Sequence, residues 1–339
     1  MDGRSPRRGS FRLEFLNKCA QVEEFEKSSI IPGVVLSQLR RCTVSFTSAC
    51  LITLLACCAI AQDKIQASLT KDPLALPEPT PEQNLALETL NGFRAIHGLE
   101  PVKIDRRLIA ASAHHVGSMT KTRELAHKET SRDTQDALAR AQTYGFDGPV
   151  AELIASGVPS APFAVVSFMD APYHRRLLLK PGQFSFGCSV DSGFACFVLG
   201  GQVQQRLVYS PPNGSEGVPT WWDGREEPSP MRGTSAKPPY GYPIMVAAYG
   251  YEDDLNCTQA TLVDPSGSTI ECAVKQPKND SEAKNSIVIV PLKPLAGETL
   301  YTVCAKFTLE GVSHVETWSF RTGESDVPAP RTKSRKRKG

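Results

Sequence analysis

The chain has 339 residues, of which 40% are hydrophobic and 22% are charged, a composition typical of a soluble globular protein rather than a disordered chain. Its 38 Lys and Arg residues are nearly balanced by 36 Asp and Glu residues, which excludes a domain-wide electrostatic reason for nucleic-acid binding. The length allows two ordinary domains together with additional termini.

An apolar stretch at 42–61 follows Arg40 and Arg41 and ends in small residues, which is the layout of a secretory signal. It predicts Sec-type export to the extracellular space, the periplasm or the cell envelope. Its apolar core is shorter than the roughly 20 residues that span a membrane, so a permanent transmembrane helix is the weaker alternative. Some forty residues precede the signal, and we expect translation to begin near Val34 or Val35.

Two processing sites compete within this signal. Small residues up to Ala61 suit ordinary cleavage before Gln62, whereas the residues that lead to Cys57 resemble a lipoprotein box. The first reading releases a soluble protein and is slightly favoured. The second reading attaches the protein to the membrane through a lipid anchor at Cys57.

Five of the ten cysteines lie in or before the signal, and no later cysteine has the CxxC spacing of a zinc ribbon. Cys188 and Cys196 bracket a tight turn, so a disulfide across a hairpin and a pair of buried free thiols are both open readings. At most one pair is expected among Cys257, Cys272 and Cys304.

Apolar residues at helical spacing dominate the chain after the proline-rich, polar tether at 62–82. The pattern then changes to two strands at 184–190 and 194–204, which a tight turn joins. Helices followed by an antiparallel hairpin predict an α+β domain. The expected helices cover 84–98, 106–123, 134–144 and 163–169.

Prolines and glycines dominate 209–239, which we interpret as a linker, although Trp221 and Trp222 indicate that part of it packs on a domain. From Gly241 to Thr322 the chain alternates between short apolar runs and turn signals, which predicts an all-β sandwich.

Four polar groups stand out in the first domain: the His114-His115 pair, His127, Glu152 and His174. Taken singly, each has an ordinary explanation, because a lone histidine is more often a structural or surface residue than a ligand.

The stretch from 90 to 127 resembles the opening of bacterial CAP-superfamily domains (cysteine-rich secretory, antigen 5 and pathogenesis-related proteins). His115 lies four residues before Met119 and His127 lies eight after it, as in that family. The resemblance continues through Glu152 and His174 and covers about 83–208. The further matching positions are Asn91, Arg94, Gly98, Leu99, Pro101, Asp105, Leu108, Ala111, Ile154, Ala155, Pro172, Arg175, Leu178, Pro181 and Gly187.

This resemblance implies a CAP-type α-β-α sandwich with a central cleft lined by histidines and glutamates. By resemblance, His127, Glu152 and His174 line the cleft, with His115 close by. Two imidazoles and a carboxylate are suitable ligands for Zn²⁺ or another divalent cation, with an open position for water or substrate.

The sequence departs from the family at Leu153, where the family has Asn, and at Ala171, where it has Ser. No second cleft glutamate is placed, and no other catalytic motif occurs. We therefore expect an extracellular binding module whose His/Glu cleft binds a divalent metal or a small ligand, such as a lipid or an envelope glycan. The alternatives are a metal-dependent hydrolase, for which Glu152 is the candidate catalytic residue, and a structural or adhesion protein with no cleft activity.

The second domain resembles the immunoglobulin-like modules of bacterial surface proteins, which space or present other domains. The basic tail from Arg331 to Lys338 predicts contact with anionic envelope polymers or lipid head groups, so membrane contact is expected only through this tail or Cys57. The expected organisation is an extension and signal at 1–61, a linker at 62–82, a CAP domain at 83–208, a linker at 209–239, an immunoglobulin-like sandwich at 240–324 and a basic tail at 325–339.

Overall fold

The computed structural model describes residues 75–252, 254–325 and 327. The expected signal, Cys57, most of the tether at 62–82 and the basic tail lie outside these residues, and the corresponding expectations stay predictions. No helix in the described ranges is both long enough and apolar enough to span a membrane.

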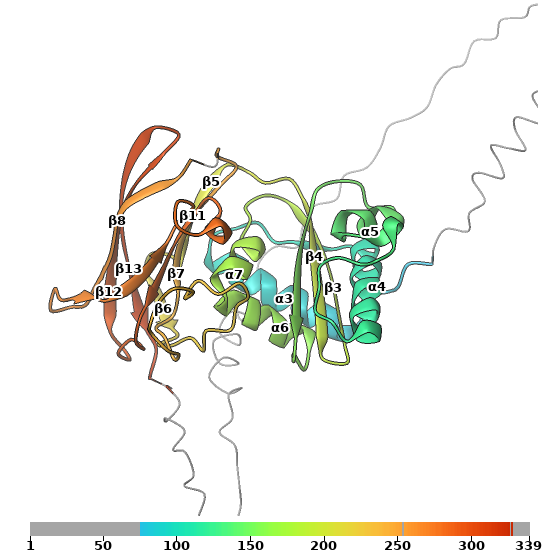
Figure 1. The fold of residues 1–339 in the computed structure, drawn as a ribbon, viewed down its shortest axis with the longest axis horizontal. Coiled ribbons are helices and arrows are strands. Elements are labelled where there is room, and N and C mark those ends of the chain that lie inside the picture. The colour runs from blue at the N-terminus through green and yellow to red at the C-terminus, as the bar shows by residue number, and fades with distance from the viewer. Residues whose placement is uncertain (1–74, 253, 326, 328–339) are drawn as a thin grey trace, which may run out of the picture. The chain divides into compact units, whose positions relative to one another are not determined.

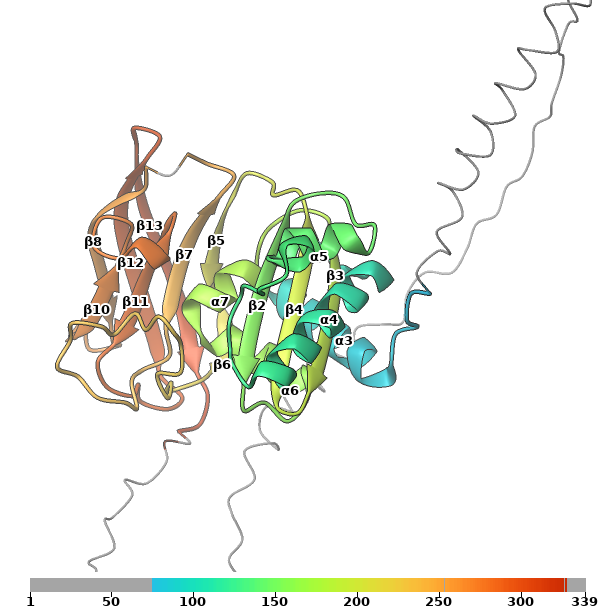
Figure 2. The same ribbon diagram turned by 45° about the vertical axis from the view of Figure 1, so that its right-hand side comes forward.

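The first half of the described chain is a three-layer arrangement of helices on both faces of one sheet (Figures 1 and 2). The sheet has the order β1-β3-β4-β2, antiparallel except for the β1–β3 pair. Helices α4 and α5 cover one face, and α3, α6 and α7 cover the other. The elements are α3 (Pro81–Ile96), β1 (Lys103–Ile104), α4 (Arg106–Thr122), α5 (Ala137–Thr143), β2 (Val150–Ser156), α6 (Ala161–Asp170), α7 (Pro172–Leu178), β3 (Phe184–Asp191) and β4 (Phe194–Gly201), with a 3₁₀ turn at Arg132–Thr134.

Local capping explains where the first helices begin. Thr80 accepts a hydrogen bond from the backbone of Gln83, whose side chain bonds back to the Thr80 N–H, and Pro81 occupies the first turn of α3. Asp105 accepts from the Arg107 N–H at the start of α4. These contacts satisfy backbone donors that a helix start leaves unpaired.

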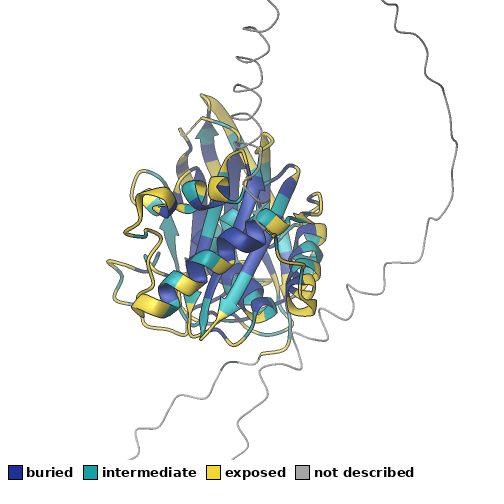
Figure 3. Ribbon diagram, turned by 90° about the vertical axis from the view of Figure 1, so that its right-hand side faces the viewer, coloured by how far each residue is buried: buried dark blue, intermediate teal, exposed yellow. Residues whose placement is uncertain are grey.

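A close backbone contact fixes α4 on β3. A Cβ at Gly187 of β3 would lie 2.2 Å from the Leu108 carbonyl carbon of α4. The absence of a side chain at Gly187 therefore sets the distance between helix and sheet. Figure 3, viewed from the α4 side, shows exposed positions mainly on loops and outer helical turns, with the strands largely buried.

The described cysteines are all free thiols, so the disulfide reading of the β3–β4 hairpin is wrong. The strand register pairs Cys188 with Phe197 and Cys196 with Ser189. Since side chains alternate between sheet faces, Cys188 lies in the core toward α3 and α6, whereas Cys196 lies in the core toward α4.

The second half, which we call the β region (residues 206–322), consists of two packed sheets, and the expected α+β class with a following β domain is confirmed. Sheet B has the order β10-β11-β7-β5, and sheet C has the order β6-β13-β12-β8-β9. Two of its strands, β5 and β6, begin within or just before the range expected as a linker. The strands are β5 (Arg206–Ser210), β6 (Ser215–Val218), β7 (Ile244–Tyr249), β8 (Asn256–Val263), β9 (Thr269–Ile270), β10 (Cys272–Lys275), β11 (Ser286–Pro291), β12 (Leu300–Leu309) and β13 (Val312–Thr322).

Sheet B is buried on both faces. Ile244 and Val246 of β7 face sheet C, whereas the alternating Met245 and Tyr249 join the core that includes α3, α6 and α7. Arg175 of α7, which is fully buried, crosses this contact and donates to the Pro243 carbonyl at 2.7 Å. The helical half and the β region therefore share one hydrophobic core.

Candidate functional site

Strand β2 lies at one edge of its sheet and carries Glu152. Its neighbour Leu153 belongs to the core toward α3 and α6, and Ile154 to the core toward α4. Because strand residues alternate between faces, Glu152 points toward α4 and α5, where its side chain is 4% exposed.

Three of the four candidate residues meet at this carboxylate. Glu152 Oε1 accepts a hydrogen bond from His127 Nδ1 at 2.9 Å and lies 3.7 Å from His115 Nε2. Glu152 Oε2 accepts from Arg140 of α5 at 2.5 Å. His115 is enclosed on the sheet side of α4, with its side chain 1% exposed, while His127 follows α4 on a loop and is 60% exposed.

A second buried carboxylate, Glu129, completes the arrangement. It accepts from His115 Nδ1 at 2.7 Å and from Thr134 Oγ1 at 2.8 Å, and it lies 3.3 Å from His114 Nε2. Arg140 lies 3.5 Å from it, so one guanidinium stands between two carboxylates. The name Glu152 cluster is used below for five residues: His115, His127, Glu129, Arg140 and Glu152.

The charges of the Glu152 cluster follow from these contacts. Burial raises the pKa of Glu152, but the hydrogen bond from His127 and the charge of Arg140 outweigh it and hold the pKa below its ordinary value. Burial is likewise outweighed at Glu129 by hydrogen bonds from His115 and Thr134, so its pKa is also lowered. Both carboxylates are therefore ionised at neutral pH.

The thiol of Cys196, which lies beside Glu152, is unreactive at neutral pH. Cys196 Sγ donates to Glu152 Oε2 at 3.5 Å. Burial, with the adjacent Glu152 charge, raises the pKa of this thiol well above its ordinary value. Since the thiolate is the reactive form, Cys196 is not a nucleophile at neutral pH.

The fourth candidate, His174, lies apart from the Glu152 cluster. Its Nδ1 is 3.0 Å from Glu226 Oε1, and its ring stacks on Phe168 with centroids 5.1 Å apart. Within the described ranges, no hydrogen bond or ion pair joins His174 to the Glu152 cluster.

The residues do not fit the expected centre in which His127, Glu152 and His174 hold Zn²⁺ or another divalent ion. Glu152 Oε1 is bonded to His127, and Oε2 to the permanently charged Arg140. A cation at this carboxylate would also meet the guanidinium at close range. In the part of the chain that the structure describes, no group of three His, Cys, Asp or Glu side chains is arranged to hold a metal.

What the arrangement offers instead is an oriented imidazole. A carboxylate only accepts hydrogen bonds, so the contact with Glu152 assigns the proton of His127 to Nδ1. The Nε2 lone pair is then left as a hydrogen-bond acceptor on a largely exposed ring.

Sequence reasoning missed Glu129, Arg140 and Glu226. Arg140 sits among the apolar residues of a short helix, and such a position is the signal that could have found it. Glu129, two residues after His127, lies in a mostly polar loop without periodicity. Glu226 lies in the expected linker, where no pattern marks it.

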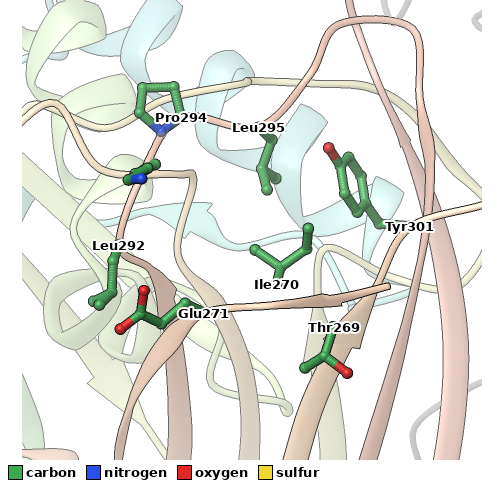
Figure 4. A pocket seen from close by; sticks show the side chains of 8 residues that line it. Thr269, Ile270, Glu271, Leu292, Pro294, Leu295 and Tyr301 are labelled. Carbon is green, nitrogen blue, oxygen red and sulfur yellow. The ribbon is translucent and has the colours of Figure 1, made fainter. Parts of the chain in front are cut away.

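A pocket of about 300 Å³ lies in the β region, away from the Glu152 cluster (Figure 4). Ile270, Leu295 and Tyr301 line its apolar part, and Glu271 and Lys293 lie at its polar part. No histidine or cysteine is among the residues that line this pocket, and none of its lining residues belongs to the candidate site.

Residues 87–198 match the sequence model of the cysteine-rich secretory protein family, CAP. No curated protein matches the chain.

Three solved structures are similar over about a third of the chain. The first is an extracellular protein with an SCP domain from Bacillus anthracis, with 17% identity, 37% of this chain and 45% of that chain covered, and a TM-score of 0.33. The second is an outer surface protein from Borrelia burgdorferi, with 17% identity, 36% of this chain and 92% of that chain covered, and a TM-score of 0.30. The third is a cysteine-rich secretory protein from Staphylococcus aureus, with 20% identity, 37% of this chain and 41% of that chain covered, and a TM-score of 0.29. The chain thus spans less than half the length of the Bacillus and Staphylococcus proteins.

Proposed function

Since residues 87–198 are a CAP domain, we propose that this chain is an exported binding module whose exposed His127 edge holds a hydroxyl-rich ligand, an envelope glycan. The observation that carries the proposal is the pairing of His127 with Glu152, which leaves Nε2 of a 60% exposed imidazole as an acceptor.

The Glu152 cluster supports binding because it holds this imidazole in place. His127 donates to a carboxylate that Arg140 fixes from the other side, and Arg140 also donates to the His127 carbonyl at 3.2 Å. A side chain positioned by such contacts loses little entropy when a ligand binds.

The surroundings of His127 favour a glycan over a lipid chain. The neighbouring loop residues are exposed and include the charged Arg123, Glu124 and Lys128. The apolar exception is Leu125, which is 47% exposed and offers a surface for the C–H face of a sugar ring. A lipid chain instead requires a largely apolar cavity.

Export rests on the apolar stretch at 42–61 behind Arg40 and Arg41. Expression of the full chain in a bacterial host, followed by N-terminal sequencing and mass measurement of the product, tests this part. A chain that begins at Gln62 supports ordinary export, and a diacylated Cys57 supports lipid anchoring. An uncleaved cytosolic chain contradicts export.

Calorimetric titration of the purified chain with soluble muropeptides, the disaccharide-peptide fragments of peptidoglycan, tests the ligand class. We expect one binding site per chain and at least about a fivefold loss of affinity in His127→Ala, the effect of one lost hydrogen bond. His314→Ala is the matched control, because His314 is a partly exposed histidine of β13.

Two further titrations, with lipid vesicles and with Zn²⁺, distinguish a glycan ligand from a lipid or a metal ion. Vesicles of anionic phospholipid should show no binding that depends on His127, and Zn²⁺ should show none that is lost in a His127→Ala, His174→Ala double variant. Absent muropeptide binding, or equal affinity in wild type and His127→Ala, contradicts the proposal. Stoichiometric Zn²⁺ binding that the double variant loses would replace the glycan with a metal ion.

A further inference from the structure

A carboxylate from outside the CAP domain is enclosed against the start of α7. Glu226 has a side chain that is 0% exposed. Its Oε1 accepts from the backbone N–H groups of Tyr173 at 2.8 Å and His174 at 3.0 Å, and lies 3.0 Å from His174 Nδ1. Its Oε2 is buried and has no hydrogen-bond partner among the described residues. Because burying a carboxylate is costly, three donors converging on one oxygen indicate a defined role at His174.

The segment that carries Glu226 is anchored to the β region. Trp222 and Tyr240 exchange both backbone hydrogen bonds, at 2.8 and 2.9 Å, and both side chains are buried. The carbonyl of Thr220 accepts from the N–H of Leu295 at 2.8 Å. The segment is therefore tied to the β region at Thr220 and packs with Trp222 and Tyr240 in the core that the β region shares with the helices.

These contacts fix both the proton and the plane of the His174 ring. Oε1 of Glu226 already accepts two backbone N–H groups, so the ring nitrogen beside it is a donor and Nδ1 carries the proton. Stacking on Phe168, with 18° between the rings, holds the plane. The remaining nitrogen, Nε2, has no hydrogen-bond partner among the described residues and is not fully enclosed.

We propose that Glu226 is the positioning residue of His174, and that the β region thereby completes the ligand site of the CAP domain. A second contact supports the same dependence, because the Tyr173 hydroxyl donates to Asp280 of the β region at 2.9 Å. The proposal rests on the proposed function in one respect: Nε2 of His174, which lies on the other face of the edge strand β2, accepts a further hydroxyl of the glycan. A CAP domain without the β region lacks the carboxylate that orients this acceptor.

The test reads the protonated nitrogen of His174 by ¹⁵N NMR of the histidine-labelled full chain, with His174→Gln used to assign the signal. Wild type should show the Nδ1–H form. Glu226→Ala removes the acceptor and should mix the two tautomers, whereas Glu226→Gln keeps an oxygen for the donors and should retain Nδ1–H. Glu227→Ala, at the exposed neighbouring residue, should change nothing.

His97 provides an internal check of folding, because its Nδ1 lies 2.7 Å from the Phe93 carbonyl, its Nε2 lies 3.0 Å from Ser210 Oγ, and it makes no hydrogen bond to Glu226. If Glu226→Ala alters the His97 signal, Glu226→Asp replaces it, since a carboxylate one methylene shorter no longer reaches Nδ1. Wild type with Nε2–H, or an unchanged His174 tautomer in the folded Glu226→Ala or Glu226→Asp variant, overturns the positioning role.

Muropeptide affinity separates this inference from the proposed function. We expect the Glu226→Ala variant to bind muropeptides at least about fivefold more weakly, the effect of one misplaced hydrogen bond, and Glu226→Gln to restore most of the affinity. A tautomer change without any muropeptide binding in wild type refutes the glycan ligand and supports positioning. Full affinity in a variant with mixed tautomers refutes the completion of the site by the β region.

Discussion

Arg140 and Glu152 form an ion pair of 2.5 Å in which the guanidinium is 1% exposed and the carboxylate 4% exposed. The same guanidinium also lies 3.5 Å from the buried Glu129. A buried ion pair gains little over its desolvation cost, but the loss of one partner leaves the other charge uncompensated. The Glu152 cluster is therefore most sensitive to the removal of its shared cation.

Arg140→Met should destabilise the protein by about 3–5 kcal/mol, because two buried carboxylates then lose their common cation. Urea unfolding at pH 7 measures the change. Arg132→Met, at an exposed arginine of the preceding 3₁₀ turn, should cost less than about 0.5 kcal/mol. A loss below about 1 kcal/mol in Arg140→Met would show that the carboxylates are solvated in the folded protein.

Stability should fall in acid because of the same two carboxylates. Glu129 and Glu152 have lowered pKa values in the folded protein, relative to an ordinary 4.5. Their contribution is therefore present above pH 4.5 and is lost as the pH falls through the folded values. Urea unfolding across this range should show a steeper decline in wild type than in a Glu129→Gln, Glu152→Gln double variant. Parallel curves would contradict this assignment, and Glu227→Gln serves as the exposed control.

Two glycines near α4 should respond in opposite directions to alanine. Gly187→Ala places a Cβ against the backbone of Leu108 and should cost about 1–3 kcal/mol or more. Gly117→Ala, on the exposed side of α4 with open space around it, should stabilise by about 0.5–1 kcal/mol. Thermal unfolding of both variants checks the pair, and a stabilising Gly187→Ala would mean that α4 does not lie this close to β3.

The purified protein should contain no Cys188–Cys196 disulfide, since the two thiols lie on opposite faces of the sheet. Alkylation of the folded protein followed by mass spectrometry should label the partly exposed Cys272 and Cys304 before the buried Cys188 and Cys196. A reducing agent should leave the midpoint of thermal unfolding unchanged. A drop of several degrees on reduction would contradict the free-thiol state.

Most of the first domain could be predicted from sequence because its elements are locally encoded. Helical apolar spacing predicted α4 within one residue of its ends, and the turn between Cys188 and Cys196 predicted the β3–β4 hairpin. The resemblance to CAP domains grouped His127 with Glu152 and put His115 close by, and the structure brings both histidines to Glu152.

The rest of the candidate site depends on contacts that sequence spacing does not encode. Whether His174 meets Glu152 or Glu226 is decided by the face of β2 and by the path of a segment 52 residues away. The burial of Arg140 likewise follows from the packing of α5 on β2, because its own sequence neighbours reveal only that a charge interrupts an apolar helix face. Only the three-dimensional arrangement shows which charges compensate each other.

Because sheet B is buried on both faces, the helical half of the described chain depends on the β region for part of its core. Met245, Ala247 and Tyr249 of β7 pack against the helices. A chain shortened after Gly201 would therefore expose the hydrophobic surface of the helices that these residues cover. Such a truncated chain should aggregate rather than fold as an independent domain. Any replacement for the helical half would therefore need an apolar surface that fits the side chains of β7.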